Sequence, residues 1–252
     1  MGHSMIIGKK KSSKLASLVL WLSVIAGLLV LLMLFGAAMG LWEPIDGFRY
    51  YRTWFKSIGF TVCGISILCL IFLITQRRLA GKKKAILSLL IGLAILWPMI
   101  SSVVGESISY PLIHDISTDT INPPQFLTLK EDRDGARNTL VYGGPKIAAQ
   151  QIEAFPDIIP IISTLSPDDA YSKALSVGKT MGWKIIGEDP AVRRYEGTAK
   201  TPFFKFVDDT VVVVSETPTG SRIDIRSVSR IGRGDIGVNA KRIREFINIF
   251  NQ

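Results

Sequence analysis

The sequence predicts a membrane-anchored α+β protein in which three transmembrane helices precede one soluble domain. Three apolar runs without charge, at about residues 15–41, 58–75 and 85–104, each have the roughly 18 or more residues that a helix needs to cross a bilayer. After residue 104 the apolar runs stop, and a pattern of helix, four strands and helix follows. We therefore expect a membrane region at 1–104 and a soluble domain at 105–252.

The excess positive charge of the chain is confined to the membrane region. Residues 1–104 contain twelve Lys/Arg and two Asp/Glu, whereas residues 105–252 contain eighteen and nineteen. A domain that binds nucleic acid would carry its basic excess on the folded part. The charge is therefore typical of a topology signal, and no nucleic acid is expected as a partner.

The basic residues beside the spans predict the orientation. Four lysines precede the first span, five basic residues lie between the second and third, and residues 43–57 between the first two hold three, partly offset by two acids. Cytoplasmic flanks are enriched in Lys and Arg. The N-terminus is therefore expected in the cytoplasm and the soluble domain outside it. The basic residues concerned are Lys9, Lys10, Lys11, Lys14, Arg77, Arg78, Lys82, Lys83 and Lys84.

Residues 105–165 are rich in proline, interleaved with Asp, Asn, Thr and Gly. This composition predicts an extended, irregular segment of the soluble domain with one short helix near 147–154. The segment is expected to lie across the folded core that follows it.

The α+β core is predicted at residues 166–252. Ser166 and Pro167 form a helix start, and Gly182 ends that helix. Alternating apolar residues then predict a four-stranded antiparallel meander, and apolar residues at helical spacing predict a last helix at about 236–250. The four strands are expected at 183–188, 192–199, 207–216 and 222–230.

One of these strands indicates that both faces of the sheet are covered. Val211, Val212, Val213 and Val214 are consecutive, so apolar side chains point to both sides. The two helices account for one face only. The other is expected to be covered by the proline-rich segment, which we favour, or equally by a second copy of the chain or a lipid-like ligand.

Several unusual motifs occur in an order that resembles domain-of-unknown-function family 1499, over about residues 108–250. That family includes bacterial envelope proteins and plant plastid proteins and has no established activity. The resemblance implies a fold and a compartment, the inner (cytoplasmic) membrane of a cell envelope with a periplasmic domain, and it supplies no catalytic residue. The motifs are Tyr110-Pro-Leu-Ile-His-Asp-Ile-Ser-Thr-Asp-Thr, Asn122-Pro-Pro-Gln-Phe, Met181-Gly-Trp, Phe206-Val-Asp-Asp, Ser221-Arg-Ile-Asp-Ile-Arg-Ser-Val-Ser-Arg, Gly234-Asp235 and Asn239.

Three residues of the proline-rich segment, His114, Asp115 and Asp119, are candidates for binding a ligand. Together with Asn122 they would suit an oxygen-rich metal site with one imidazole. Asp, Ser, Thr and Asn before prolines also form turns, and we favour that interpretation. No Gly-x-Ser-x-Gly elbow is present, so a serine hydrolase is not expected.

Arg226, Arg230 and Arg233 form a second group of candidates, where the last strand meets the last helix. In one interpretation, Arg230 and Arg233 hold a phosphate or carboxylate at the helix N-terminus. In the other, Asp235 caps the helix and the arginines pair with aspartates of neighbouring strands. We favour the second interpretation because Asp235 stands where an anion would bind.

The cysteines and a cluster of phenylalanines are two further groups of interest. Cys63 and Cys69 lie within a span, six residues apart and too distant on a helix for a disulfide. Phe203, Phe204 and Phe206 cannot all point the same way in an extended segment, so at least one is expected in the core. For the others, packing in the core is slightly favoured over contact with the membrane or a partner.

These observations favour an uncharacterised, non-enzymatic membrane protein whose domain binds a partner protein or an amphipathic ligand near the membrane. The alternatives are an enzyme acting on an envelope lipid or glycan through His114, and a structural subunit of a membrane complex. The expected partners are membrane lipids and an envelope protein or a second copy of the chain. No catalytic residue, metal or cofactor is assigned.

Overall fold

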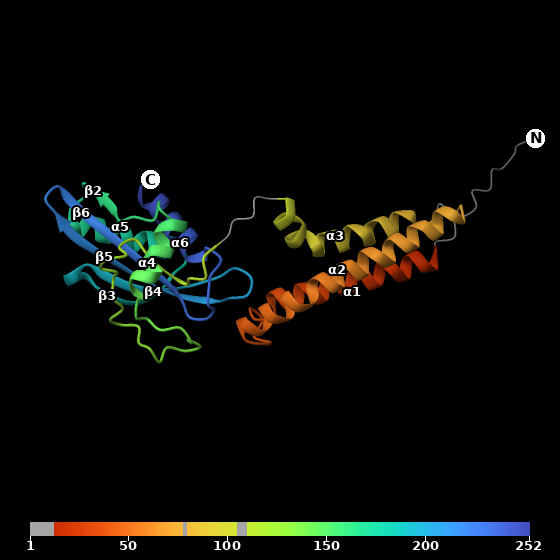
Figure 1. The fold of residues 1–252 in the computed structure, drawn as a ribbon, viewed down its shortest axis with the longest axis horizontal. Coiled ribbons are helices and arrows are strands. Elements are labelled where there is room, and N and C mark those ends of the chain that lie inside the picture. Colours follow the sequence, from red (N-terminus) through yellow and green to blue (C-terminus); the bar gives the residue numbers. More distant parts are fainter. Residues whose placement is uncertain (1–12, 78–79, 105–109) are drawn as a thin grey trace, which may run out of the picture. The chain divides into compact units, whose positions relative to one another are not determined.

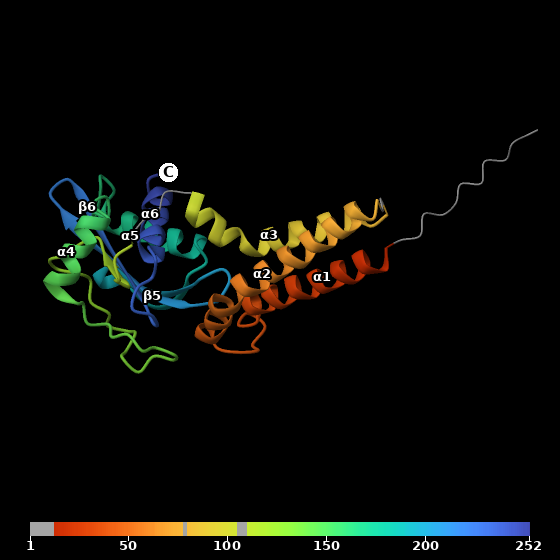
Figure 2. The same ribbon diagram turned by 45° about the vertical axis from the view of Figure 1, so that its right-hand side comes forward.

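The structure is a computed structural model that describes residues 13–77, 80–104 and 110–252 (Figures 1 and 2). The chain divides into two compact units, Met1–Ser107 and Ile108–Gln252, which are described separately below. Lys9, Lys10, Lys11 and Arg78, which contribute to the expected orientation, lie outside the described residues.

The first unit contains three helices, α1 (Lys14–Phe35), α2 (Pro44–Thr75) and α3 (Lys82–Val104). Each is long and apolar enough to cross a membrane. In the most apolar stretches of α1, α2 and α3, only 17%, 33% and 22% of the residues are buried. Most of these side chains therefore face outward, as lipid contact requires. The protein is therefore membrane-associated.

The second helix extends beyond the span that the sequence predicted. Residues 43–57 were expected to form a loop, but α2 begins at Pro44, which takes the first helical turn where a missing N–H costs nothing. An ion pair between Asp46 and Arg49, one turn apart at 3.1 Å, supports the charged start of the helix. The 32 residues of α2 are longer than one bilayer crossing needs.

Two glycines allow α2 and α3 to pack closely. A Cβ atom on Gly59 would lie 2.6 Å from the side chain of Leu96, and one on Gly92 would lie 2.6 Å from Sγ of Cys63. Small residues at such contacts are typical of helix pairs in membranes. Cys63 and Cys69 are both free thiols in this region.

The soluble unit is built on one antiparallel sheet of six strands, where four were predicted. The strand order is β1-β6-β5-β4-β3, and β2 also pairs with β6. The four predicted strands are present and form the expected meander. They are β3 (Lys184–Asp189), β4 (Arg194–Lys200), β5 (Val207–Thr217) and β6 (Gly220–Ser229).

The two additional strands come from the proline-rich segment, which is therefore less irregular than expected. β1 (Asp115–Ser117) and β2 (Ile161–Ser163) pair with opposite ends of β6. Each has only three residues, so neither shows a period that a sequence pattern can reveal. Between them lies α4 (Gly144–Ala154), in which Gln151 pairs its side-chain amide with both backbone groups of Ser117.

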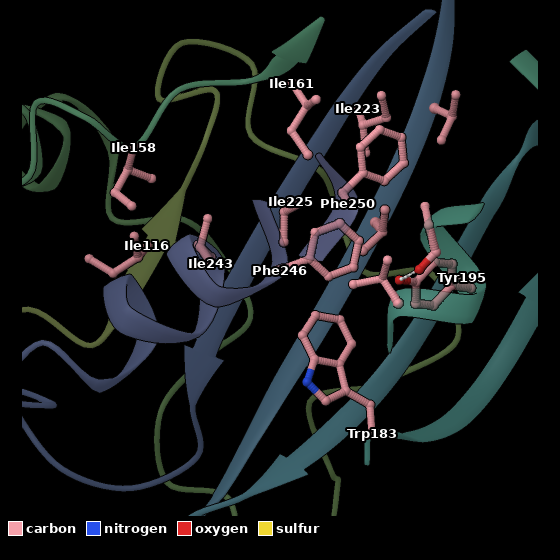
Figure 3. Packing of buried hydrophobic residues seen from close by; sticks show 14 of the residues in the cluster. Ile116, Ile158, Ile161, Trp183, Tyr195, Ile223, Ile225, Ile243, Phe246 and Phe250 are labelled. Carbon is pink, nitrogen blue, oxygen red and sulfur yellow. Dashed lines mark hydrogen bonds between the residues drawn. The ribbon is translucent and has the colours of Figure 1, made fainter. Parts of the chain in front are cut away.

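Two helices and one face of the sheet enclose the hydrophobic core. α5 (Pro167–Thr180) is capped by Ser166, whose hydroxyl accepts the N–H of Asp169 at 3.2 Å, and α6 (Val238–Phe250) follows β6. Trp183 stacks on Phe246 within this core, with ring centroids 5.5 Å apart (Figure 3). Ile residues from β1, β2, β6 and α6 belong to the same core (Figure 3).

The proline-rich segment covers the second face of the sheet, as the preferred sequence interpretation holds. Val211 and Val228, which point to this face, are fully buried. Residues 124–142 contact the charged side chains of β4, β5 and β6 through the hydrogen bonds described below. The domain thus has an apolar core on one side of the sheet and a charged, hydrogen-bonded layer on the other.

Candidate functional site

The candidate site lies in the layer between the sheet and the proline-rich segment, and Arg226 is at its centre. The Arg226 side chain is fully buried. Its Nε and Nη2 donate to the two oxygens of Asp115 at 2.9 and 2.7 Å. Nη1 donates to the carbonyl of Pro124 at 3.0 Å, and Nη2 also donates to that of Leu140 at 2.7 Å. Four of the five N–H donors of an arginine therefore have partners within the protein.

Two aromatic rings enclose the same guanidinium group. The centroids of the Phe126 and Tyr142 rings lie 5.2 and 5.3 Å from its central carbon, within the range of cation–π attraction. Burial, with the nearby carboxylate of Asp115, raises the pKa of Tyr142 to about 12. Arg226 and Asp115 thus hold segments far apart in the sequence together and have no open side for a ligand.

Asp119 has the turn-forming role that we favoured from the sequence. Its Oδ1 accepts the backbone N–H groups of Ile121 and Asn122 at 2.9 and 2.7 Å, and its Oδ2 accepts from Arg222 at 2.7 Å. Although partial burial acts in the opposite direction, these hydrogen bonds and the charge of Arg222 lower the pKa of Asp119.

His114 is half-buried and its ring lies against the backbone of the loop after β6. Nδ1 is 3.4 Å from the carbonyl oxygen of Arg233. The carbonyl of His114 accepts the N–H of Ser229 at 2.9 Å, which continues the pairing of β1 with β6. Within residues 13–77, 80–104 and 110–252, no three His, Cys, Asp or Glu side chains are gathered as a metal site would require.

Arg230 belongs to a second buried ion-pair network. Its Nε and Nη2 lie 2.9 and 2.8 Å from Oδ1 of Asp209, which is fully buried. Arg133, from the proline-rich segment, pairs with the other oxygen of Asp209. Nη1 of Arg230 also donates to the carbonyl of Asp134 at 2.7 Å. Arg230 therefore joins β5, β6 and the covering segment.

Asp235 occupies the N-terminus of α6, as the structural interpretation of the arginine strand expects. Its two oxygens accept the N–H groups of Gly237 and Asn239 at 2.9 and 2.8 Å. The helix starts at Val238 instead of 236 because Ile236 and Gly237 both have positive φ angles. Arg233 is exposed, and its guanidinium group makes none of the ion pairs found among the described residues. Of the three candidate arginines, only Arg233 is accessible to an anion.

Sequence reasoning missed a third element of the layer, the carboxylate of Glu196 on β4. This side chain is 1% exposed and accepts the backbone N–H groups of three consecutive residues, Leu127, Thr128 and Leu129. The shortest distance from each of these backbone nitrogens to a carboxylate oxygen of Glu196 lies between 2.5 and 3.0 Å. A charged residue within an otherwise buried strand was the available signal, but its partners are almost 70 residues away.

A fourth network, also missed, lies on the helix side of the sheet. Arg242 of α6 bridges Asp208 of β5, at 2.5 Å, and the buried Asn239, at 2.6 Å. Asn239 in turn accepts the hydroxyl of Ser227 at 2.6 Å. These buried polar groups all have partners, which is the usual condition for a structural network.

One small cavity adjoins these charged groups. It has a volume of about 70 Å³ and lies beside Glu196, between residues 127–128 and the start of β4. A larger open hollow of about 460 Å³ is formed by apolar side chains of α3 alone. Neither hollow includes His114 or the three candidate arginines.

The comparison with protein families identifies this domain. A family model described as "Protein of unknown function (DUF1499)" matches residues 115–250. The chain belongs to the DUF1499 family. No curated protein matches the chain.

The match runs from the first residue of β1 to the last residue of α6. The DUF1499 domain thus includes both additional strands, the covering segment and all four polar networks, and it excludes the three apolar helices. These networks neutralise buried charges in pairs and bind the backbone of the loops to the sheet.

Proposed function

We propose that this DUF1499 protein is a non-catalytic binding module of the cell envelope. Three spans anchor it in the inner (cytoplasmic) membrane with the N-terminus in the cytoplasm, and the domain binds a partner protein on the periplasmic side. The excess of Lys and Arg before the first span and between the second and third supports this orientation.

The observation that carries the proposal is that the candidate side chains, apart from the exposed Arg233, are engaged by other groups of the domain. A general acid or base must reach a substrate proton from a cavity. Both oxygens of Asp115 bind Arg226, Asp119 closes a turn, and the ring of His114 faces a backbone carbonyl. This arrangement supports a structural role for these residues and weighs against an enzyme of lipids or glycans.

The cavities also favour a protein partner over an enclosed amphipathic ligand. Pockets that bind small organic molecules usually measure about 300–1,000 Å³. The hollow beside Glu196, at about 70 Å³, is several-fold smaller. A partner would therefore bind the surface of the domain.

A surface suited to such contact lies at the β2 end of the sheet. Ile121 and Ile162 are 85% and 65% exposed. Both lie beside Arg222: Asp119 binds Arg222 and the N–H of Ile121, and Ile162 is opposite Arg222 in the pairing of β2 with β6. Exposed apolar residues around a satisfied charge are typical of the centre of a protein interface.

The test is site-specific photocrosslinking of the full chain in its own membrane. A photoreactive residue at 121 or 162 should capture the same protein, and Ile121→Asp with Ile162→Asp should abolish its copurification in mild detergent. The matched control is the exposed polar Glu245 on α6. Capture from the span surface alone would identify a structural subunit instead, and a lipid copurifying at one per chain would identify a lipid carrier. Either result contradicts the proposal.

A further inference from the structure

Three segments of the domain meet at one end of the sheet, opposite to the Ile121 and Ile162 surface. They are the entry segment 110–114, the turn 201–206 between β4 and β5, and the loop 231–237 before α6. The N–H of Asp235 donates to the carbonyl of Ile113 at 3.0 Å, and the N–H of Arg230 donates to that of Val207 at 3.1 Å. These bonds bring all three segments to the edge where the chain enters the domain (Figure 1).

This end of the domain exposes one large apolar side chain from each segment. Leu112 is 74% exposed, Phe203 is 52% exposed and Ile236 is 67% exposed. Leu112 lies directly beside the loop, since a Cβ atom on Gly234 would be 3.1 Å from its Cα. These three residues, called the apolar patch below, lie at the same end of the sheet, and exposed apolar residues that gather in this way often mark a contact site.

The backbone at Ile236 strengthens the case that this side chain has an external role. Its φ angle is +54°, in the left-handed region that a β-branched residue adopts rarely and at a cost. Glycine or asparagine would suit this backbone better. The isoleucine side chain is 67% exposed, so the domain itself gains little packing energy from it, and a contact outside the domain would offset the cost of this backbone.

Basic residues surround the patch. Arg137, Lys200 and Arg233 are exposed at this end, and Lys205 is half-buried in the turn. Arg137 is placed by its N–H, which donates to the carbonyl of Arg230 at 2.8 Å, and Lys200 pairs with Val207. Of the acids at this end, Asp235 binds the N–H groups of α6 through both oxygens, and Asp132 and Asp134 are exposed. The exposed basic groups therefore outnumber the acidic ones.

The length of the chain limits the distance between this patch and the membrane. α3 ends at Val104, and the entry segment starts at Tyr110. Six residues span at most roughly 20 Å when fully extended. Tyr110 itself contacts the loop, because a Cβ atom on Gly237 would lie 2.5 Å from its ring. The chain between the last span and the patch is thus short.

From these observations we propose that this end of the domain docks onto the surface of a bilayer that contains anionic lipid. Leu112, Phe203 and Ile236 enter the interface, and Arg137, Lys200 and Arg233 contact the head groups. Apolar side chains bordered by Lys and Arg are the usual composition of such interfacial surfaces. Docking would turn the Ile121 and Ile162 surface away from the membrane. The inference goes beyond the proposed partner binding and does not depend on it.

The test uses the full chain in vesicles, with an environment-sensitive fluorophore on a single cysteine. Cys63→Ala and Cys69→Ala remove the native thiols, and Ile236→Cys or Leu112→Cys introduces the labelling site. In vesicles containing phosphatidylglycerol, the emission at 236 and 112 should shift to the blue and be quenched by lipids that carry a nitroxide. Ile162→Cys is the matched control, with the same side chain and nearly the same exposure, and should show neither effect.

A second arm tests the charge contribution. Neutral phosphatidylcholine vesicles, or the combination of Arg137→Gln, Lys200→Gln and Arg233→Gln, should weaken the quenching at 236 several-fold. Labels at 236 and 112 that behave like the label at 162 would overturn the proposal. A blue shift without lipid quenching would also overturn it, because a protein surface would then cover the patch. Two labelling positions keep the test decisive if the unusual backbone at 236 does not tolerate cysteine.

Discussion

Alanine substitutions of Arg226, Arg230 and Arg233 should lower the stability of the domain in that order. Arg226→Ala leaves Asp115, only 7% exposed, without its partner and removes donors from two buried carbonyls. Removing one member of a buried ion pair costs about 3–5 kcal/mol. Because neither side chain of the pair is open to solvent, screening by water does not reduce this cost.

The other two substitutions are expected to lower the stability less. Arg230→Ala leaves Asp209 still paired with Arg133, and the lost side chain is 12% exposed. A hydrogen bond to a charged group contributes about 1.5–3 kcal/mol, so a loss of about 2 kcal/mol is expected. Arg233 is exposed. Surface substitutions of this kind change stability by less than about 0.5 kcal/mol.

The assay is urea unfolding of the full chain in a mild detergent, followed by the fluorescence of Trp183. Trp183 is the only tryptophan of residues 105–252, and Trp183→Phe identifies its share of the signal. Adding phosphate should stabilise none of the variants differently from the parent. The reasoning would be refuted if Arg226→Ala cost less than about 1 kcal/mol, or if Arg233→Ala cost as much as Arg230→Ala.

Three further predictions follow from the anchor, the domain and the covering layer. Alkaline phosphatase fused after Gln252 should be active if the domain is outside the cytoplasm, and an inactive enzyme with a fluorescent cytoplasmic reporter at the same site would reverse the orientation. Residues 108–252, the second compact unit, should be soluble and melt cooperatively when expressed alone; aggregation of that fragment would show that the domain depends on the spans. Tyr142→Phe should be neutral or stabilising near pH 7, because the buried hydroxyl has no hydrogen-bond partner among the described residues. Since burial raises the pKa of Tyr142 from 10.0 to about 12, the parent should lose stability between pH 10 and 12 as the unfolded state ionises first, and the variant should lack this step.

Local patterns were sufficient to predict the elements with strong periodicity. The Ser166-Pro167 start, the alternation along β3 to β6 and the helical spacing in α6 all depend on neighbours within a few residues. The four consecutive valines predicted a covered second face, because side chains on a strand alternate between its two sides. The favoured cover, the proline-rich segment, is the one found.

The remaining features depend on contacts between distant residues. β1 and β2 are strands only because β6 offers them an edge, and Arg226 meets Asp115 across 111 positions of sequence. The three N–H groups that bind Glu196 belong to a segment without regular structure, so no motif marks them. The late start of α6 arises from the backbone at Ile236, which no propensity predicts because isoleucine rarely adopts it.

Hydrogen exchange of the N–H groups at residues 127–129 tests most directly whether the charged layer holds the covering segment or binds a ligand. These groups lie outside any helix or strand, yet each donates to the buried carboxylate of Glu196. In the full chain in detergent they should exchange as slowly as core amides of β5, and Glu196→Gln should accelerate them. Adding phosphate should change neither rate. Fast exchange that slows only when an anionic compound is added would contradict the account, because the layer would then be an open binding site.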